Sequence, residues 1–309
     1  MFRIRFHGRG GQGIKTASRI LGTAFFLEGW QVQDAPRYGA ERRGAPIFAY
    51  VRADKKLIFE RGIITAPDLV VVVDDTLVGI PAAGVLQGLG QNSILLIHGS
   101  QTSQEWRSRI KTDAEIIVLT APAITDQEEQ PYAGAACVGA VARLTGVLSF
   151  EKLKAAFKEE LQDKPPEVIE ENIDRALEAY EAMAVFEGRV KEHDERAAVP
   201  VPPEWIEMPL DPGDVAAPAI HAGATSVEVP TGLWRTMRPV LEREACNKCT
   251  WVCGSFCPDG VISVDAKGYP EVDYDHCKGC LICVVQCPKH AFLAVPEREA
   301  ASAEEGGSS

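Results

Sequence analysis

The sequence has almost no cysteine outside one short segment, no excess of positive charge and no long apolar run. Eight of its nine cysteines lie from Cys246 to Cys287, and only Cys137 lies elsewhere, which excludes a disulfide framework spread through a secreted fold. Lys and Arg number 32 against 44 for Asp and Glu, so the net charge is −12. The chain lacks the basic face that nucleic acid or an anionic membrane surface needs, and we expect neither as a partner.

Membrane insertion and secretion are also not expected. The longest strongly apolar stretch, residues 69–73, is far shorter than the roughly 20 residues that cross a bilayer. The N-terminus carries Arg3 and Arg5 and no apolar run follows them, which is unlike a secretory signal. These features predict a cytoplasmic protein.

The length of 309 residues suggests about two domains, and the first is predicted in residues 1–190. Three apolar runs without alternation are typical of parallel strands buried on both faces: residues 69–73, 94–97 and 116–119. A helix is predicted over residues 16–27, and residues 47–51 and 57–59 flank a polar turn that predicts an edge hairpin. We therefore predict a layered α/β domain with a mostly parallel sheet.

The rest of the chain changes character three times. From Ser149 the pattern is helical, with Ser149 as a cap and Pro165 and Pro166 ending one helix and starting the next. Residues 191–240 are rich in proline and predict an extended linker, either a free tether or a segment that wraps over a partner. Residues 241–297 hold the clustered cysteines, and residues 298–309 are predicted to be a disordered tail.

The cysteines form two related runs. The first is Cys246, Cys249, Cys253 and Cys257, and the second is Cys277, Cys280, Cys283 and Cys287, each ending in Cys-Pro. The second run has the spacing of bacterial [4Fe-4S] ferredoxins, in which the fourth cysteine ligates the other cluster. We therefore predict a small α+β ferredoxin-like domain with two clusters. One is held by Cys246, Cys249, Cys253 and Cys287, and the other by Cys277, Cys280, Cys283 and Cys257.

The cysteine spacing of the two runs differs by one residue. Corresponding cysteines lie 31 residues apart at Cys246 and Cys249 but 30 residues apart at Cys253 and Cys257, which places one extra residue between Cys249 and Cys253. Two zinc sites of four cysteines each are the alternative, since paired C-x2-C motifs also hold zinc. Zinc gives no reason for a duplicated loop with two Cys-Pro endings, and iron–sulfur ligation is favoured.

A glycine-rich turn, residues 8–13 (GRGGQG), follows a predicted strand and precedes a helix. With Asp34 about 20 residues later it has the outline of a dinucleotide fingerprint. The preceding residues 3–6 alternate with arginine, which is unlike a buried first strand. Three interpretations stay open: a nicotinamide or flavin nucleotide, another anion, or a purely structural or interface turn. The candidate anion or interface residues are Gly10, Gly11, Gln12, Gly13, Arg42 and Arg43.

Four segments together carry a resemblance. Residues 6–13 (FHGRGGQG) and 38–46 (YGAERRGAP) resemble the γ subunit of 2-oxoacid:ferredoxin oxidoreductases. Residues 231–240 (TGLWRTMRPV) and 273–280 (DYDHCKGC) resemble the small δ subunit of the pyruvate-type members. The chain is therefore similar to a γ–δ fusion of this family, and most similar to the δ subunits of its oxalate oxidoreductase members.

The resemblance implies a division of labour. Thiamine diphosphate and Mg would lie on partner α and β subunits, in a dimer of heterotrimers, and external ferredoxin would receive the electrons. This chain would be the electron-transfer subunit and would contain no catalytic residue of its own. Oxalate, cleaved to CO2, is the favoured substrate. The alternatives are a γδ subunit of pyruvate:ferredoxin oxidoreductase and a self-contained iron–sulfur oxidoreductase with a nucleotide in its N-terminal domain.

Overall fold

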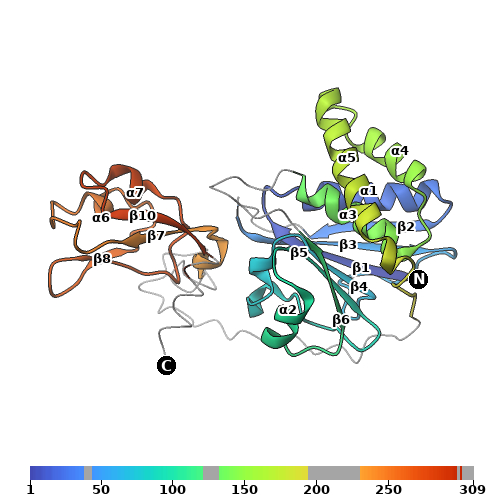
Figure 1. Ribbon diagram of the computed structural model, residues 1–309, viewed down its shortest axis with the longest axis horizontal. Coiled ribbons are helices and arrows are strands. Elements are labelled where there is room, and N and C mark those ends of the chain that lie inside the picture. The colour runs from blue at the N-terminus through green and yellow to red at the C-terminus, as the bar shows by residue number, and fades with distance from the viewer. Residues whose placement is uncertain (38–43, 121–131, 194–229, 298–299, 301–309) are drawn as a thin grey trace, which may run out of the picture. The chain divides into compact units, whose positions relative to one another are not determined.

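The computed structural model describes residues 1–37, 44–120, 132–193, 230–297 and 300. The chain divides into two compact units, residues 1–198 and 199–309 (Figure 1). The first unit contains the larger sheet and the long helices, and the second contains all eight clustered cysteines.

A six-stranded sheet forms the centre of the first unit. Its strands are β1 (Phe2–Arg9), β2 (Gln31–Arg37), β3 (Pro46–Asp54), β4 (Leu69–Val72), β5 (Ile94–Gly99) and β6 (Glu115–Thr120). They lie in the order β2-β3-β1-β4-β5-β6. β1, β4, β5 and β6 run parallel, whereas β3 is antiparallel to both β1 and β2. The predicted layered α/β fold is confirmed, and β4, β5 and β6 coincide with the three apolar runs.

Helices cover both faces of this sheet. One face is covered by α1 (Ile14–Leu27) and α3 (Ala133–Thr145). Two further helices, α4 (Phe150–Glu160) and α5 (Pro166–Ala182), pack on α1 and α3, and the short turn η3 (Ala184–Phe186) follows α5. The other face packs against α2 (Ser103–Arg109) and the turns η1 (Asp75–Leu77) and η2 (Pro81–Ala83). Strands with apolar residues on both faces are therefore buried throughout, as their unbroken apolar runs predicted.

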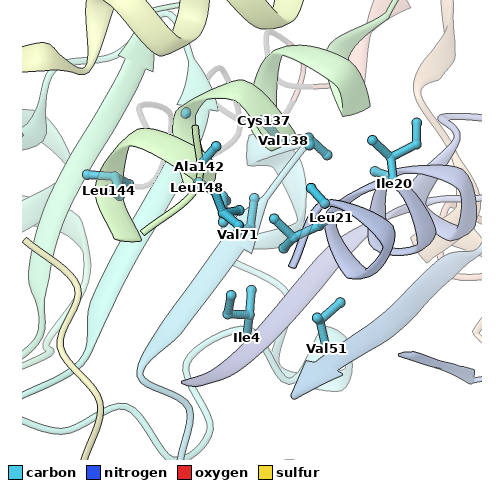
Figure 2. Close-up of a cluster of buried hydrophobic side chains, with 14 of the residues drawn as sticks. Ile4, Ile20, Leu21, Val51, Val71, Cys137, Val138, Ala142, Leu144 and Leu148 are labelled. Carbon is cyan, nitrogen blue, oxygen red and sulfur yellow. The ribbon is translucent and has the colours of Figure 1, made fainter. Parts of the chain in front are cut away.

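The larger core lies between the sheet and the four helices. Figure 2 shows Ile4, Val51 and Val71 of three neighbouring strands together with Leu21 of α1 and Val138 of α3. All five side chains are fully buried. The helix starts follow the local signals: the Ser149 hydroxyl caps α4 and Pro166 is the first residue of α5, and both predictions are confirmed.

β1 differs from the sequence expectation, because its alternating arginines are buried with the rest of the strand. Arg3 pairs with Glu60 at 3.0 Å. Arg5 donates hydrogen bonds to the carbonyl groups of Val85, at 2.9 Å, and Gln87, at 2.7 Å. Remote loops supply the carboxylate and carbonyl oxygens that let the guanidinium groups leave water.

The predicted edge hairpin is wrong in its second arm. β3 pairs with β2 on one side and with β1 on the other, so neither of its edges is free to take a strand at residues 57–59. Those residues form an irregular loop in which Phe59 is 82% exposed. Glu60, next to them, ties the loop to Arg3 and Arg52.

The second unit is small and mixed in structure. Its elements are η5 (Thr231–Trp234), β7 (Met237–Leu241), α6 (Val252–Ser255), β8 (Ile262–Val264), β9 (Pro270–Val272), α7 (Ile282–Gln286) and β10 (Phe292–Pro296). β7 pairs with β10 and β8 pairs with β9, both antiparallel. This is the predicted ferredoxin-like α+β layout.

The predicted linker and tail lie mostly outside the described residues. η5 and all of β7 except its last residue fall within the range 191–240 that the sequence assigned to the linker, and residues 194–229 are not described. Of the predicted tail, only Ala300 is described. Across the described part of the chain, no helix has the length and apolarity needed to cross a membrane.

Candidate iron–sulfur centre

The two cysteine runs fold in the same way, and their backbone conformations show the duplication. Lys248 and Gly279 have φ of 52° and 69° and precede the second cysteine of each run. Trp251 and Leu281, with φ of 49° and 61°, lie just before α6 and α7. Left-handed residues at these points turn the chain sharply, so that short loops can direct several thiols to one place.

The same comparison locates the extra residue of the first run. Lys248 and Gly279 are 31 positions apart, whereas Trp251 and Leu281 are 30 positions apart. The shift therefore falls between Cys249 and Trp251, which makes Thr250 the inserted residue. The insertion precedes α6, so Cys253 on α6 still corresponds to Cys283 on α7.

One cavity gathers cysteines from both runs. Its lining includes Cys246, Cys249 and Cys253 from the first run and Cys287 from the second. The backbone N–H of Ala291 donates a hydrogen bond to the Cys287 sulfur at 3.3 Å. The structure thus brings together the four side chains that the spacing assigned to the first cluster.

The second set of four also meets. Burial raises the pKa of the Cys283 thiol to about 12, and the neighbouring thiols of Cys277, Cys280 and Cys257 add to that rise. Cys257 comes from the first run, so both sets contain one cysteine from the opposite run. Burial likewise raises the pKa of Cys253. Four thiolates held together repel one another, and a cationic metal core that binds all four removes that cost.

The donor set and its spacing fit a cluster. Four thiolates around a single zinc ion stand only about 3.8 Å apart, from Zn–S bonds of about 2.3 Å. A cubane of four irons and four sulfides is a larger object and needs its ligands further apart.

A buried arginine beside the second set was not anticipated. The Arg235 guanidinium donates a hydrogen bond to the carbonyl of Cys277 at 2.7 Å and is 4% exposed. It lies in the segment interpreted as linker, 42 positions before the cysteine it contacts. The cluster of tryptophan and two arginines at residues 234–238, unusual for a tether, was the available signal.

The glycine-rich turn is closed by the protein itself. Gly13, with φ of 71°, ends the turn immediately before α1. The Asp74 carboxylate contacts two of its side chains: it accepts a hydrogen bond from Gln12 Nε2 at 2.8 Å and lies 3.2 Å from Arg9 Nε. Gly10 exchanges backbone hydrogen bonds with residues 44–45. The two polar side chains of the turn, Arg9 and Gln12, are therefore held by an internal carboxylate.

The other parts of the dinucleotide outline do not fit either. Asp34 lies on β2, which is separated from β1 by the antiparallel β3, and not on a parallel strand beside β1. A hydrogen bond from Ser18 reaches it, although burial raises the pKa of Asp34. Arg42 and Arg43, the remaining anion or interface candidates, lie outside the described residues.

An α/β unit followed by a ferredoxin-like unit with two cysteine runs defines an iron–sulfur protein. Residues 3–182 match the family "Pyruvate ferredoxin/flavodoxin oxidoreductase", and residues 270–293 match "4Fe-4S binding domain". The chain belongs to the pyruvate ferredoxin/flavodoxin oxidoreductase family, as a gamma-type subunit that carries a 4Fe-4S motif. The resemblance to 2-oxoacid:ferredoxin oxidoreductases is confirmed.

Several known proteins are similar to parts of this chain. The common gamma subunit of the pyruvate/ketoisovalerate oxidoreductases of Pyrococcus furiosus is 38% identical over 189 residues, which is 60% of this chain and 100% of that subunit. Pyruvate synthase subunit PorC of Thermotoga maritima is 36% identical over 188 residues, 60% of this chain and 96% of that subunit. The crystal structure of the pyruvate oxidoreductase subunit PORC of Thermotoga maritima has 33% identity and a TM-score of 0.47, and covers 58% of this chain and 95% of that one.

Proposed function

We propose that this chain is the electron-transfer subunit, γ and δ in one, of a thiamine diphosphate-dependent 2-oxoacid:ferredoxin oxidoreductase, and that it binds two [4Fe-4S] clusters. The observation that carries the proposal is the cavity lined by Cys246, Cys249, Cys253 and Cys287. Ferredoxin-type ligation requires three cysteines of one run and the fourth of the other, and a disordered or zinc-bound segment has no such requirement. Family membership supports the assignment.

The residues of this chain hold the clusters and shield them. Cys246, Cys249, Cys253 and Cys287 would ligate the first, and Cys277, Cys280, Cys283 and Cys257 the second. Each cluster, when bound, takes up and gives off one electron at a time. Leu241 and Phe292 line the first cavity beside the cysteines, and apolar walls of this kind keep water away from a cluster and influence its potential.

The partners follow from the same proposal. Thiamine diphosphate and Mg would lie on α and β subunits, in a dimer of heterotrimers, and external ferredoxin would receive the electrons. The name of the Pyrococcus furiosus relative, a common gamma subunit of two oxidoreductases, supports a subunit role. Affinity purification of the native chain under anaerobic conditions tests this. Larger thiamine diphosphate-binding subunits must co-purify, and a chain that purifies alone contradicts the proposal.

Oxalate and pyruvate are the two candidate substrates. The resemblance of the fused γ–δ arrangement favours oxalate, and the names of the matched relatives favour pyruvate. Reduction of ferredoxin by the purified complex, measured with each substrate with and without coenzyme A, separates them. Oxalate cleavage needs no acyl acceptor, whereas conversion of pyruvate to an acyl thioester does.

Iron content tests the cluster assignment. The native chain should contain about eight irons and eight sulfides, four per cluster. Cys246→Ser and Cys287→Ser should each lose about four irons, and the double variant should lose no more, because both cysteines serve the same cluster. Cys246→Ser combined with Cys257→Ser should lose all eight. Cys137→Ala, which changes a buried thiol of the first unit, is the matched control and should keep eight.

A further inference from the structure

The segment that contains Arg235 is fixed against the loop that carries Cys277. The backbone N–H of Gly232 donates to the carbonyl of Asp275 at 2.7 Å, and the Thr231 hydroxyl donates to the carbonyl of His276. A Cβ atom at Gly232 would lie 2.1 Å from the carbonyl oxygen of Tyr274, so the backbones approach as closely as glycine allows. The close backbone contact at Gly232 therefore fixes the position of the segment that carries Arg235.

Arg235 directs one edge of its guanidinium at the Cys277 loop and the other edge away from it. Nη1 donates to the carbonyl groups of Cys277 and Tyr274, each at 2.7 Å. Nε and Nη2 pair with the two carboxylate oxygens of Glu297 at 2.5 and 2.8 Å. The loop closes over the stem of the same side chain, because a Cβ at Gly279 would meet Arg235 Cγ at 2.6 Å.

The Arg235 guanidinium contacts the Cys277 backbone directly, and its counter-ion Glu297 is shared with Arg238 at 2.6 Å. Arg235 is 4% exposed and Cys277 is 7% exposed, so water screens little of the interaction between them. A fixed cation beside a ligand stabilises the form of a cluster that carries one more negative charge.

The first cysteine set has a different kind of cation. Lys248 lies between Cys246 and Cys249, but it is exposed. Its amine lies 4.1 Å from the centre of the Tyr269 ring and donates to the carbonyl of Lys267 at 2.7 Å. Solvent and counter-ions screen such a charge, so it influences a nearby cluster much less than a buried guanidinium does.

We propose that Arg235 is a positioning residue that raises the reduction potential of the cluster held by Cys277, Cys280, Cys283 and Cys257 above that of the other cluster. This inference rests on the proposed two-cluster function. A single electron would then pass between the clusters. The cluster of the Cys246 set is oxidised by this transfer, and the cluster of the Cys277 set is reduced. The charge of Arg235 sets the direction of this transfer.

Redox titration of the full-length holoprotein, with dithionite and mediators and with the reduced clusters followed by electron paramagnetic resonance, tests the inference. Arg235→Gln should lower one midpoint by at least a tenfold change in the reduction equilibrium, about 59 mV for one electron. Arg235→Lys, which keeps the charge, should shift it less. Lys248→Gln is the matched control for loss of an exposed cation and should move neither midpoint by that amount.

Single-cluster backgrounds assign the shift. In Cys246→Ser the remaining midpoint should fall on adding Arg235→Gln, and in Cys280→Ser it should not. If Arg235→Gln disrupts the loop, Glu297→Gln decides, because removing the counter-ion should raise the same midpoint. Eight irons with unmoved midpoints in Arg235→Gln and Glu297→Gln overturn the inference and leave the proposed function intact. A native protein without iron overturns the proposed function itself.

Discussion

Asp74→Asn is the sharpest test of the view that the glycine-rich turn is closed internally. One carboxylate oxygen accepts from Gln12 and lies 3.2 Å from Arg9 Nε, and the other accepts from the backbone N–H of Thr76 at 3.1 Å. The side chain of Arg9 is 2% exposed and that of Asp74 is 9% exposed. Asparagine keeps the shape but turns one acceptor oxygen into an amide donor that faces two other donors.

The expected cost follows from this burial. Removing one partner of a buried ion pair costs about 3–5 kcal/mol, because the other charge stays buried without compensation. Asp74→Asn should therefore lower the free energy of unfolding of the first unit by about that amount. Glu187→Gln is the control, since Glu187 pairs with Arg143 at 3.2 Å but is 54% exposed. An exposed pair contributes about 1 kcal/mol or less.

Urea denaturation of the full-length chain, followed by far-ultraviolet circular dichroism, measures both variants. The double variant Arg9→Gln and Asp74→Asn should cost less than the sum of its parts, because it removes both charges of one pair. An Asp74→Asn protein within 1 kcal/mol of the native chain would refute the reasoning. That result would favour the alternative interpretation, in which the turn is an anion-binding site.

Three further predictions follow from the first unit. Burial raises the pKa of Asp68 from 3.8 to about 6. Ionising this side chain in the folded chain therefore lowers the free energy of unfolding by about 3 kcal/mol. The contribution of Asp68 to stability is full below pH 3.8 and is lost as the pH rises through 6. Asp68→Asn should therefore raise the free energy of unfolding at pH 8 and lose that advantage at pH 4, in urea titrations at both values. Gly139→Ala should destabilise the chain by at least about 2 kcal/mol, since its Cβ would lie 2.0 Å from the carbonyl oxygen of Ala176. Gly134→Ala on the same helix, with a nearest approach of 3.3 Å, should cost far less by the same assay. Neither NAD+ nor FAD should raise the thermal midpoint, and a rise of several degrees with either would contradict the closed turn.

Local patterns in the sequence were sufficient wherever the packing was apolar. The runs that became β4, β5 and β6 lack alternation because both faces of each strand meet apolar neighbours, and that condition is visible in the strand itself. The caps at Ser149 and Pro166 are similarly local, since the residues that satisfy the helix ends lie within a few positions.

The errors arose where partners are remote. β1 alternates with arginine, a pattern typical of a strand with one wet face, yet Glu60 and the carbonyl groups of residues 84–87 cover that face. The hairpin at residues 57–59 was predicted from a turn signal, but β3 was already paired on both sides. No local pattern reports which edges of a strand the rest of the chain will use.

The cysteine runs fall between these cases. Which cysteines meet could be predicted, because short loops of fixed spacing restrict where each thiol can point. The position of the extra residue could not be read from the cysteines, and it needed the left-handed backbone at Trp251 and Leu281. Arg235 was missed because its contact with Cys277 spans 42 positions and leaves no periodic signal.

The two units treat their charged groups in opposite ways, and this contrast indicates where a cofactor belongs. In the first unit the Asp74 carboxylate accepts a hydrogen bond from Gln12 and forms an ion pair with Arg9, the two polar side chains of the glycine-rich turn. In the second unit the thiols do not stabilise one another's charge, because burial, together with the neighbouring thiols, raises the pKa of Cys283 to about 12. Thiolates held close together repel one another, so they are stable in the ionised form only around a cationic partner. We therefore place the proposed redox chemistry in the second unit.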